Sequence, residues 1–375
     1  FTVSAVWTAL CGSFATFLAA RILGGIGIGL ASNLSPMYIA EVSPAAVRGR
    51  FVSINQLTIV IGVLAAQIAN MLIAEPVPKG ATAQFLLESW NGQWGWRWMF
   101  GAETVPAWLF FMLMFFMPES PRWLVKAGRS DLALRVLEKI GGPDHARKEL
   151  ADVQATLAGS EIAAVRFGDL LEPRLLKIIA LGVFLAVFQQ WCGINVIFSY
   201  AQEVFADAGY GVSDILFNIV ITGVVSLAFT FVAIRSVDRL GRRPLMLVGA
   251  GGLAVIYAIL GWGYYARSQG VHMLILVVAA IACYTMTLAP VTWVIISEIF
   301  PNRIRGAAMA IAVFSLWVGS TVLIFTFPLL KGAMGAHGAF WLYGAICAVG
   351  FVVIRLWLPE TKGKSLEQIE RELVD

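Results

Sequence analysis

The sequence predicts an all-α integral membrane protein, and three observations carry that prediction. Of its 375 residues, 59% are hydrophobic and only 13% are charged, whereas a soluble domain is about 45–50% apolar and about 25% charged. Ten apolar runs follow one another along the chain. The loops between them are alternately rich and poor in lysine and arginine. These features exclude a soluble enzyme, and a net charge of +4 is too small to indicate a nucleic-acid-binding protein.

The apolar runs are read as membrane-spanning helices, because a helical span needs about 20 mostly apolar residues. They are residues 1–14, 16–40, 50–74, 98–117, 176–202, 211–234, 244–266, 272–298, 306–330 and 338–358. The first run is short and starts without a methionine, so we expect the chain to begin inside a helix.

The positions of the basic residues predict the orientation of these spans. Of the 27 lysines and arginines, 22 lie in loops 41–50, 119–178, 235–243 and 299–306 and in the tail from 355. The opposite loops hold only Lys79, Arg97, Arg267 and Lys331. Since cytoplasmic loops are rich in lysine and arginine, we expect a multi-pass cell-membrane protein whose long loop and C-terminus are cytoplasmic.

Two motifs occur twice, which indicates an internal repeat. An E-x-x-P-x-x-x-R-G loop starts at Glu41 and again at Glu298, and a P-E-[ST] motif follows two spans later at Pro118 and again at Pro359. Parallel repeats of this kind indicate a two-half transporter with its site at the repeat interface. The second half contains six runs and the first only four, so we expect the first two helices of the first half to be missing.

The ordered motifs of the chain resemble the sugar porter family of the major facilitator superfamily. The likeness rests on R-x-x-G-G-x-G-x-G from Arg21, P-M-Y-I-A-E from Pro36, P-E-S-P-R-W-L from Pro118, Q-Q-x-x-G-I-N from Gln189, D-R-L-G-R-R from Asp238 and P-E-T-K-G from Pro359. It covers essentially the whole chain and is closest to bacterial members that carry xylose with a proton.

The resemblance implies the major facilitator fold, with two six-helix halves of which the first two helices are missing here. We expect an incomplete N-terminal half over 1–118, a cytoplasmic short-helix domain over 119–175, a C-terminal half over 176–360 and a cytoplasmic tail over 361–375. The implied function is alternating-access transport of a neutral monosaccharide, a pentose or a hexose, by proton symport. A facilitated uniporter and a membrane sugar sensor are the alternatives.

The candidate sugar site combines amides with indoles. Its residues lie in four different spans: Gln56, Gln189, Gln190, Asn195, Trp293 and Trp317. Amide groups donate and accept together, which suits sugar hydroxyls, and tryptophan offers a flat apolar face to a pyranose. The central parts of these spans carry no charged residue, so the ligand should be neutral. Contacts between helices and plain packing are the alternative roles.

The spacing around this site predicts two helix breaks. On an ideal helix Gln190 and Asn195 are about 140° apart, so Gly193 between them must allow a break if they act together. Pro290 should kink the 272–298 span and free the carbonyl of Met286. Five positions depart from the pattern of xylose-carrying members, which leaves the particular sugar open: Val63, Ser199, Ser226, Ala289 and Leu316.

Charged residues suggest a coupling site and a gate. Arg21 lies inside a span, where a charge is costly and marks a functional or paired site; the resemblance implies pairing with an aspartate on the first helix, and a lone anchor is the alternative. The resemblance also implies cytoplasmic gating salt bridges among Glu41, Arg48, Glu119, Arg122, Asp238, Arg242, Glu298, Arg305 and Glu360. The alternative is that these charges only set the orientation of the protein in the membrane.

The glycine motif and the cysteines have structural interpretations. Gly25 and Gly29 are four residues apart and predict close helix packing. The four cysteines lie in apolar runs and are expected to be buried small hydrophobic residues. The sequence shows no nucleophile–base set and no metal-ligand cluster, so we expect no enzyme activity, no metal and no cofactor. The expected partners are a monosaccharide, a proton and the lipid bilayer, but no nucleic acid, with a monomer as the assembly.

Overall fold

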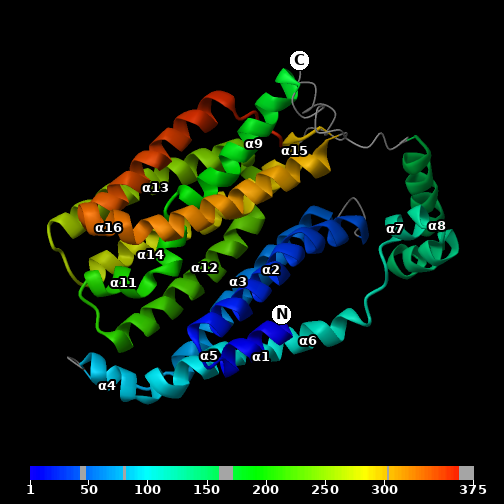
Figure 1. The fold of residues 1–375 in the computed structure, drawn as a ribbon. Helices are drawn as coiled ribbons and strands as arrows, with labels where there is room; N and C mark the ends of the chain where they lie inside the picture. Colours follow the sequence, from blue (N-terminus) through cyan, green and yellow to red (C-terminus); the bar gives the residue numbers. More distant parts are fainter. Residues whose placement is uncertain (43–47, 79–81, 160–171, 302–303, 363–375) are drawn as a thin grey trace. The chain divides into compact units, whose positions relative to one another are not determined.

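The computed structural model describes the backbone of residues 1–42, 48–78, 82–159, 172–301 and 304–362. In this part of the chain all regular secondary structure is helical (Figure 1). The chain divides into two compact units, Phe1–Ala163 and Ala164–Asp375. The division falls inside the segment predicted as a cytoplasmic domain, and the predicted domain boundaries remain a prediction.

The first unit contains the helices that precede the long loop, followed by two helices of that loop. They are α1 (Thr2–Leu10), α2 (Phe14–Val42), α3 (Arg48–Ile73), α4 (Ala83–Glu88), the π-helix η1 (Asn91–Gly95), α5 (Trp96–Ala102), α6 (Thr104–Met114), α7 (Pro121–Lys126) and α8 (Ser130–Gly159). α8 is interrupted at Gly142, where φ is +83° and Pro143 follows.

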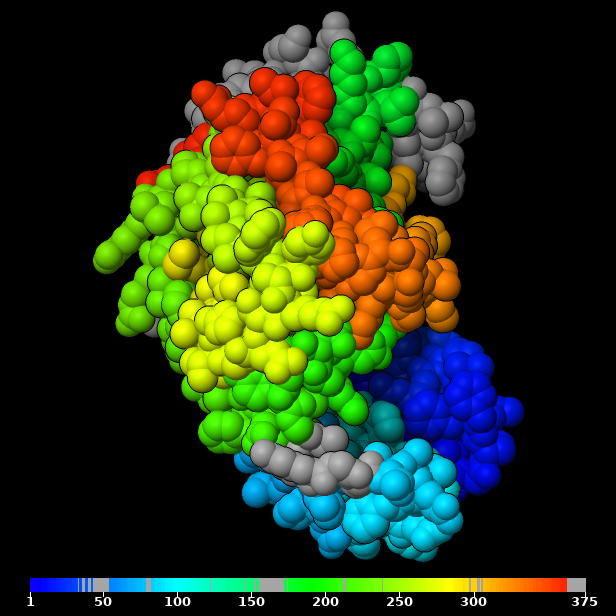
Figure 2. Space-filling view, turned by 90° about the vertical axis from the view of Figure 1, so that its left-hand side faces the viewer, coloured from blue at the N-terminus to red at the C-terminus, as the bar shows by residue number. Residues whose placement is uncertain are grey.

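The second unit contains the remaining helices. They are α9 (Pro173–Trp191), α10 (Ile194–Ser199), α11 (Ala201–Asp207), α12 (Val212–Leu240), α13 (Arg242–Tyr265), α14 (Val271–Met286), α15 (Leu288–Ile299) and α16 (Arg305–Trp357). α13 and α9 both pack along α16. In the space-filling view the orange and red surface of α16 adjoins the yellow-green surface of α13 (Figure 2).

Each of the ten predicted spans coincides with helix, although the helices are divided differently. Within the described residues, seven helical segments are long and apolar enough to cross a membrane. One of them, Gly306–Trp357, contains two predicted spans, which meet at Gly335 with φ +71° and ψ 172°. α1 is too short to count, and the 98–117 span is divided between α5 and α6 at Glu103.

The predicted break at Pro290 is present. α14 ends at Met286 and α15 begins at Leu288, with Thr287 between them at φ −121° and ψ −84°. The cause is the ring of Pro290, which lacks an N–H donor for the carbonyl of Met286. At the break the Thr287 N–H donates to the Tyr284 carbonyl at 3.1 Å, and the Thr287 hydroxyl donates to the Cys283 carbonyl at 2.5 Å.

The prediction of close helix packing at Gly25 and Gly29 is wrong in detail. Within the described residues, a Cβ at either position would have nothing within 4 Å. Gly24 is the glycine that faces α1, because a Cβ there would lie 2.6 Å from the Ser4 hydroxyl oxygen. Ser4 in turn donates to the Ala20 carbonyl at 2.7 Å, so the α1–α2 contact lies one residue earlier on α2.

Candidate functional site

Three side-chain amides from α9 and α10 form a hydrogen-bonded cluster, which we call the amide triad: Gln189, Gln190 and Asn195. Gln190 Nε2 donates to Gln189 Oε1 at 2.9 Å, and Asn195 Nδ2 donates to Gln190 Oε1 at 2.5 Å. Gln189 is buried, and the other two are half-buried. The triad therefore unites three of the six residues predicted for the sugar site.

Gly193 makes this cluster possible, as the spacing predicted. α9 ends at Trp191 and α10 starts at Ile194, with Gly193 between them at φ +86°. L-residues rarely adopt this left-handed conformation, whereas glycine does so freely. A Cβ at Gly193 would also lie 2.8 Å from Cβ and Cγ of Tyr343 on α16. Both the backbone angle and the neighbouring ring thus require glycine here.

The triad keeps hydrogen-bonding capacity for a ligand. Each amide has two N–H donors and an oxygen that accepts two bonds. Among the described residues, the two bonds above are the hydrogen bonds of these three side chains. The amide nitrogen of Gln189 and the oxygen of Asn195 therefore have donor and acceptor capacity left. Paired donors and acceptors in one cluster suit a polyhydroxylated neutral molecule.

Among the described residues, no hydrogen bond or ring contact joins Trp293 or Trp317 to the triad. Trp293 lies on α15, partly buried against the core of the second unit. Trp317 lies on α16 with 43% of its surface exposed. Gln56 lies on α3 in the first unit and is half-buried.

α12 carries a row of four buried polar side chains that was not predicted from the sequence. Asn218, Thr222, Ser226 and Thr230 are spaced by four residues and are each at most 9% exposed, so they share one helix face. Ser226 Oγ lies 3.3 Å from Thr285 Oγ1 of α14. The sequence signal was the four-residue spacing itself. Since buried hydroxyl pairs join helices in a membrane, the Ser226–Thr285 pair stabilises the contact of α12 with α14, whereas Thr222 and Thr230 bond to carbonyls of their own helix.

Arg21 has a partner that the sequence analysis overlooked. Its Nη1 lies 3.4 Å from Glu103 Oε2, with 41% and 47% of the two side chains exposed. The guanidinium also lies over the Phe100 ring, 5.1 Å from the centroid. Glu103 occupies the junction of α5 and α6, within an apolar run. A single glutamate inside the predicted 98–117 span was the signal that could have identified it.

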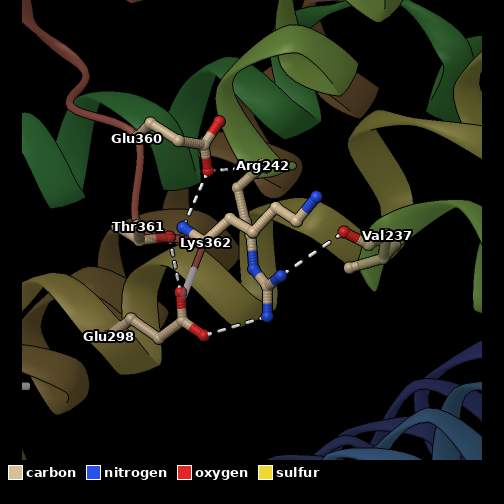
Figure 3. Close-up of polar contacts among 6 residues, drawn as sticks. All are labelled: Val237, Arg242, Glu298, Glu360, Thr361 and Lys362. Carbon is tan, nitrogen blue, oxygen red and sulfur yellow. Dashed lines mark hydrogen bonds and ion pairs between the residues drawn. The ribbon is translucent and has the colours of Figure 1, made fainter. Parts of the chain in front are cut away.

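A polar network ties three motifs together at one end of the second unit (Figure 3). Glu360 accepts from the backbone N–H groups of Arg242 at 3.0 Å, Arg243 at 3.1 Å and Lys362 at 2.8 Å. Arg242 and Arg243 are the first two residues of α13. The carboxylate thus satisfies N–H groups that a helix start leaves free, and its charge complements the positive end of the helix dipole.

Glu298, at the end of α15, is the second carboxylate of this network. Its Oε1 lies 3.4 Å from Arg242 Nη2, and its Oε2 accepts from the Thr361 hydroxyl at 2.6 Å. Burial acts to raise the pKa of Glu360, but the backbone N–H donors outweigh it and hold that pKa below its usual range.

Three of the residues predicted for the gate take part in this network, and their gating role remains a prediction. The Arg242–Glu298 ion pair is present, whereas Glu360 binds backbone N–H groups because its carboxylate lies at the start of α13. In the first unit the P-E-S motif also contacts the preceding repeat helix, since Tyr38 Oη on α2 donates to the Pro118 carbonyl at 2.8 Å. Glu119 is exposed. The remaining gate residues lie outside the described side chains: Glu41, Arg48, Arg122, Asp238 and Arg305.

The apolar helices, the broken helix with its amides and the repeated charged motifs define a helical membrane transporter. The chain belongs to the sugar (and other) transporter family, whose model matches residues 1–373. The resemblance seen in the sequence is therefore confirmed.

Individual relatives agree with this assignment. The D-xylose-proton symporter of Escherichia coli (strain K12) is 40% identical over 367 residues, which are 96% of this chain and 72% of that protein. The arabinose-proton symporter of Bacillus subtilis (strain 168) is 35% identical over 372 residues, covering 99% and 78%. The structure of the proton:xylose symporter XylE bound to 6-bromo-6-deoxy-D-glucose matches with a TM-score of 0.80 and 37% identity, covering 99% and 80%.

Proposed function

We propose that this protein transports a neutral monosaccharide, a pentose or a hexose, across the cell membrane together with a proton, by alternating access. The observation that carries the proposal is the amide triad, in which Asn195 reaches Gln190 across the break at Gly193. Discontinuous helices of transporters typically form the substrate site. The relatives named as xylose-proton and arabinose-proton symporters support the substrate class and the coupling.

The chemistry of the triad fits a sugar rather than an ion. Gln189, Gln190 and Asn195 carry no charge, and each hydroxyl of a sugar both donates and accepts. The exposed Trp317 ring adds an apolar face for the C–H groups of a pyranose. We assign Gln56 and Trp293 to the same site on the family likeness. A phosphorylated sugar or an organic acid would lack a cationic partner in the triad.

The Arg21–Glu103 pair is the proposed proton-coupling element. Glu103 Oε2 lies 3.4 Å from Arg21 Nη1, and a charged pair inside an apolar span marks a functional site. A movement that separates the two side chains leaves the Glu103 carboxylate without its cation, which is why we assign the coupling to this pair.

The network of Glu298, Arg242 and Glu360 is proposed as part of the cytoplasmic gate. Glu41, Arg48, Glu119, Arg122, Asp238 and Arg305 complete it in this proposal. The C-terminal tail is placed in the cytoplasm by the excess of lysine and arginine on its side of the membrane, and we propose a monomer embedded in the bilayer.

Facilitated uniport is the second candidate. The glucose facilitated diffusion protein of Zymomonas mobilis is 35% identical over 356 residues, which are 93% of this chain and 73% of that protein. Proteoliposomes with an imposed pH gradient separate the two mechanisms. Symport predicts that the gradient drives accumulation of xylose, arabinose or glucose, with an equal entry of protons. Equilibration without accumulation would establish uniport, and failure to move any of these sugars would refute the proposal.

A further inference from the structure

The segment that carries Asn195 is held by few of its own hydrogen bonds. α10 has six residues and α11 has seven. Gly193 interrupts the helix before α10, and Tyr200, at φ −118° and ψ 30°, interrupts it before α11. Such short helices are marginal in isolation. Contacts with other helices must therefore fix the position of this segment.

α12 packs against α11, and α14 and α16 pack against α10; one face of α16 adds specific polar and ring contacts. Ile324, Phe327 and Lys331 are spaced as i, i+3 and i+7, which places them on the same side of the helix. Pro328 lacks an N–H for the carbonyl of Ile324, four residues earlier. That carbonyl accepts instead from Tyr200 Oη at 2.9 Å. The Tyr200 ring also contacts the Phe327 ring, with 4.8 Å between the centroids.

Lys331 adds a charged contact one turn further along. Its Nζ lies 2.7 Å from Asp207 Oδ2 and 3.5 Å from Glu203 Oε2, both on α11. The lysine side chain is 26% exposed, and the two acidic side chains are 35% and 47% exposed. Charges that are partly withdrawn from water interact more strongly than fully exposed ones. On the same helix, Val204 is 2% exposed and Phe205 is fully buried, and the Val204 carbonyl accepts from Tyr264 Oη of α13 at 2.8 Å.

We propose that Lys331, acting through Asp207 and Glu203, is a positioning residue that clamps α11 on α16 and thereby sets the place of Asn195 in the amide triad. The consequence for sugar rests on the proposed function, whereas the clamp itself does not. Release of the clamp frees α10 and α11 to move about Gly193. It also exposes Val204.

The test measures this exposure directly. A cysteine introduced by Val204→Cys is labelled with N-ethylmaleimide in the purified protein without sugar, after subtraction of labelling in the protein without that substitution. Lys331→Met should raise the labelling rate about fivefold, in line with the loss of two partly exposed ion pairs. Lys331→Arg keeps the cation and should label at a rate close to that of the Val204→Cys protein. The double variant Lys331→Asp with Asp207→Lys exchanges the two charges and should also label close to that rate.

Two controls separate the clamp from general unfolding. Arg267→Met removes an exposed cation of the same unit and should leave the labelling rate unchanged. Tyr200→Phe removes the bond to Ile324 but keeps the ring, and it should raise the rate without Lys331 being altered. An unchanged rate in Lys331→Met, or no recovery on charge exchange, overturns the proposal. If Lys331→Met raises the labelling rate as predicted but the protein transports no sugar, the clamp stands and only the proposed transport function is refuted.

Discussion

Asn195 donates to the side-chain oxygen of Gln190 at 2.5 Å although five residues separate them along the chain. On a continuous helix the two side chains would point about 140° apart. Their contact therefore depends on the break at Gly193, which turns α10 relative to α9. The proposed sugar site therefore exists only because the backbone is broken at Gly193.

Gly193→Ala should destabilise the protein. The substitution forces an L-residue to φ +86° and places a Cβ 2.8 Å from the side chain of Tyr343. Left-handed backbone costs about 1–2 kcal/mol and overpacking about 1–3 kcal/mol, so we expect a loss of about 2–5 kcal/mol in the free energy of unfolding. Denaturant unfolding in detergent measures it.

Gly332→Ala is the matched control for this substitution. Gly332 also lies in the second unit, on α16, and a Cβ there would meet nothing within 4 Å. Alanine favours helix by about 0.5–1 kcal/mol relative to glycine, so this variant should be as stable as the parent or slightly more stable. Equal losses in the two variants would contradict the role assigned to Gly193.

Glu360→Gln should remove a stabilisation that depends on pH. The pKa of Glu360 is lowered by backbone N–H donors, so its contribution is present above pH 4.5 and is lost as the pH falls through the folded-state pKa. At pH 7 the variant should lose about 0.5–1 kcal/mol, the size of a charge–helix-terminus interaction. The difference from the parent should shrink in thermal unfolding at pH 3.5.

Glu138→Gln serves as the comparison for the acid range. Glu138 is exposed on α8, away from any helix N-terminus, and its substitution should change stability equally little at both pH values. A Glu360→Gln variant whose loss of stability is independent of pH would show that the carboxylate charge does not act on the start of α13.

The sequence predicted the spans and the repeat because long apolar runs and repeated motifs are local patterns. It also predicted a break at Gly193 and a kink at Pro290, since glycine and proline act on the backbone beside them. Pairings between distant segments carried no such signal. Arg21 and Glu103 are 82 residues apart, and Glu360 binds backbone N–H groups, which every residue except proline has. Such contacts are determined by tertiary packing.

Glu103→Gln should uncouple sugar movement from the proton. Glutamine keeps the size of the side chain but cannot release or take up a proton, so pH-driven accumulation should be lost while sugar exchange across the membrane continues. Proteoliposome uptake under a pH gradient is compared with counterflow at equal pH. Glu88→Gln, an exposed glutamate of α4, should leave both activities intact. Retained accumulation in Glu103→Gln would place the coupling at another residue.

Sugar binding by the amide triad is the central claim, and isothermal titration calorimetry of the purified protein with xylose, glucose and arabinose tests it most directly. We predict selective binding of at least one sugar, weakened at least about tenfold in Gln190→Ala, because each lost sugar hydrogen bond costs about 1.5 kcal/mol. Gln154→Ala, which alters an exposed amide of α8, should bind like the parent. Binding that is unaffected by Gln190→Ala would contradict the site.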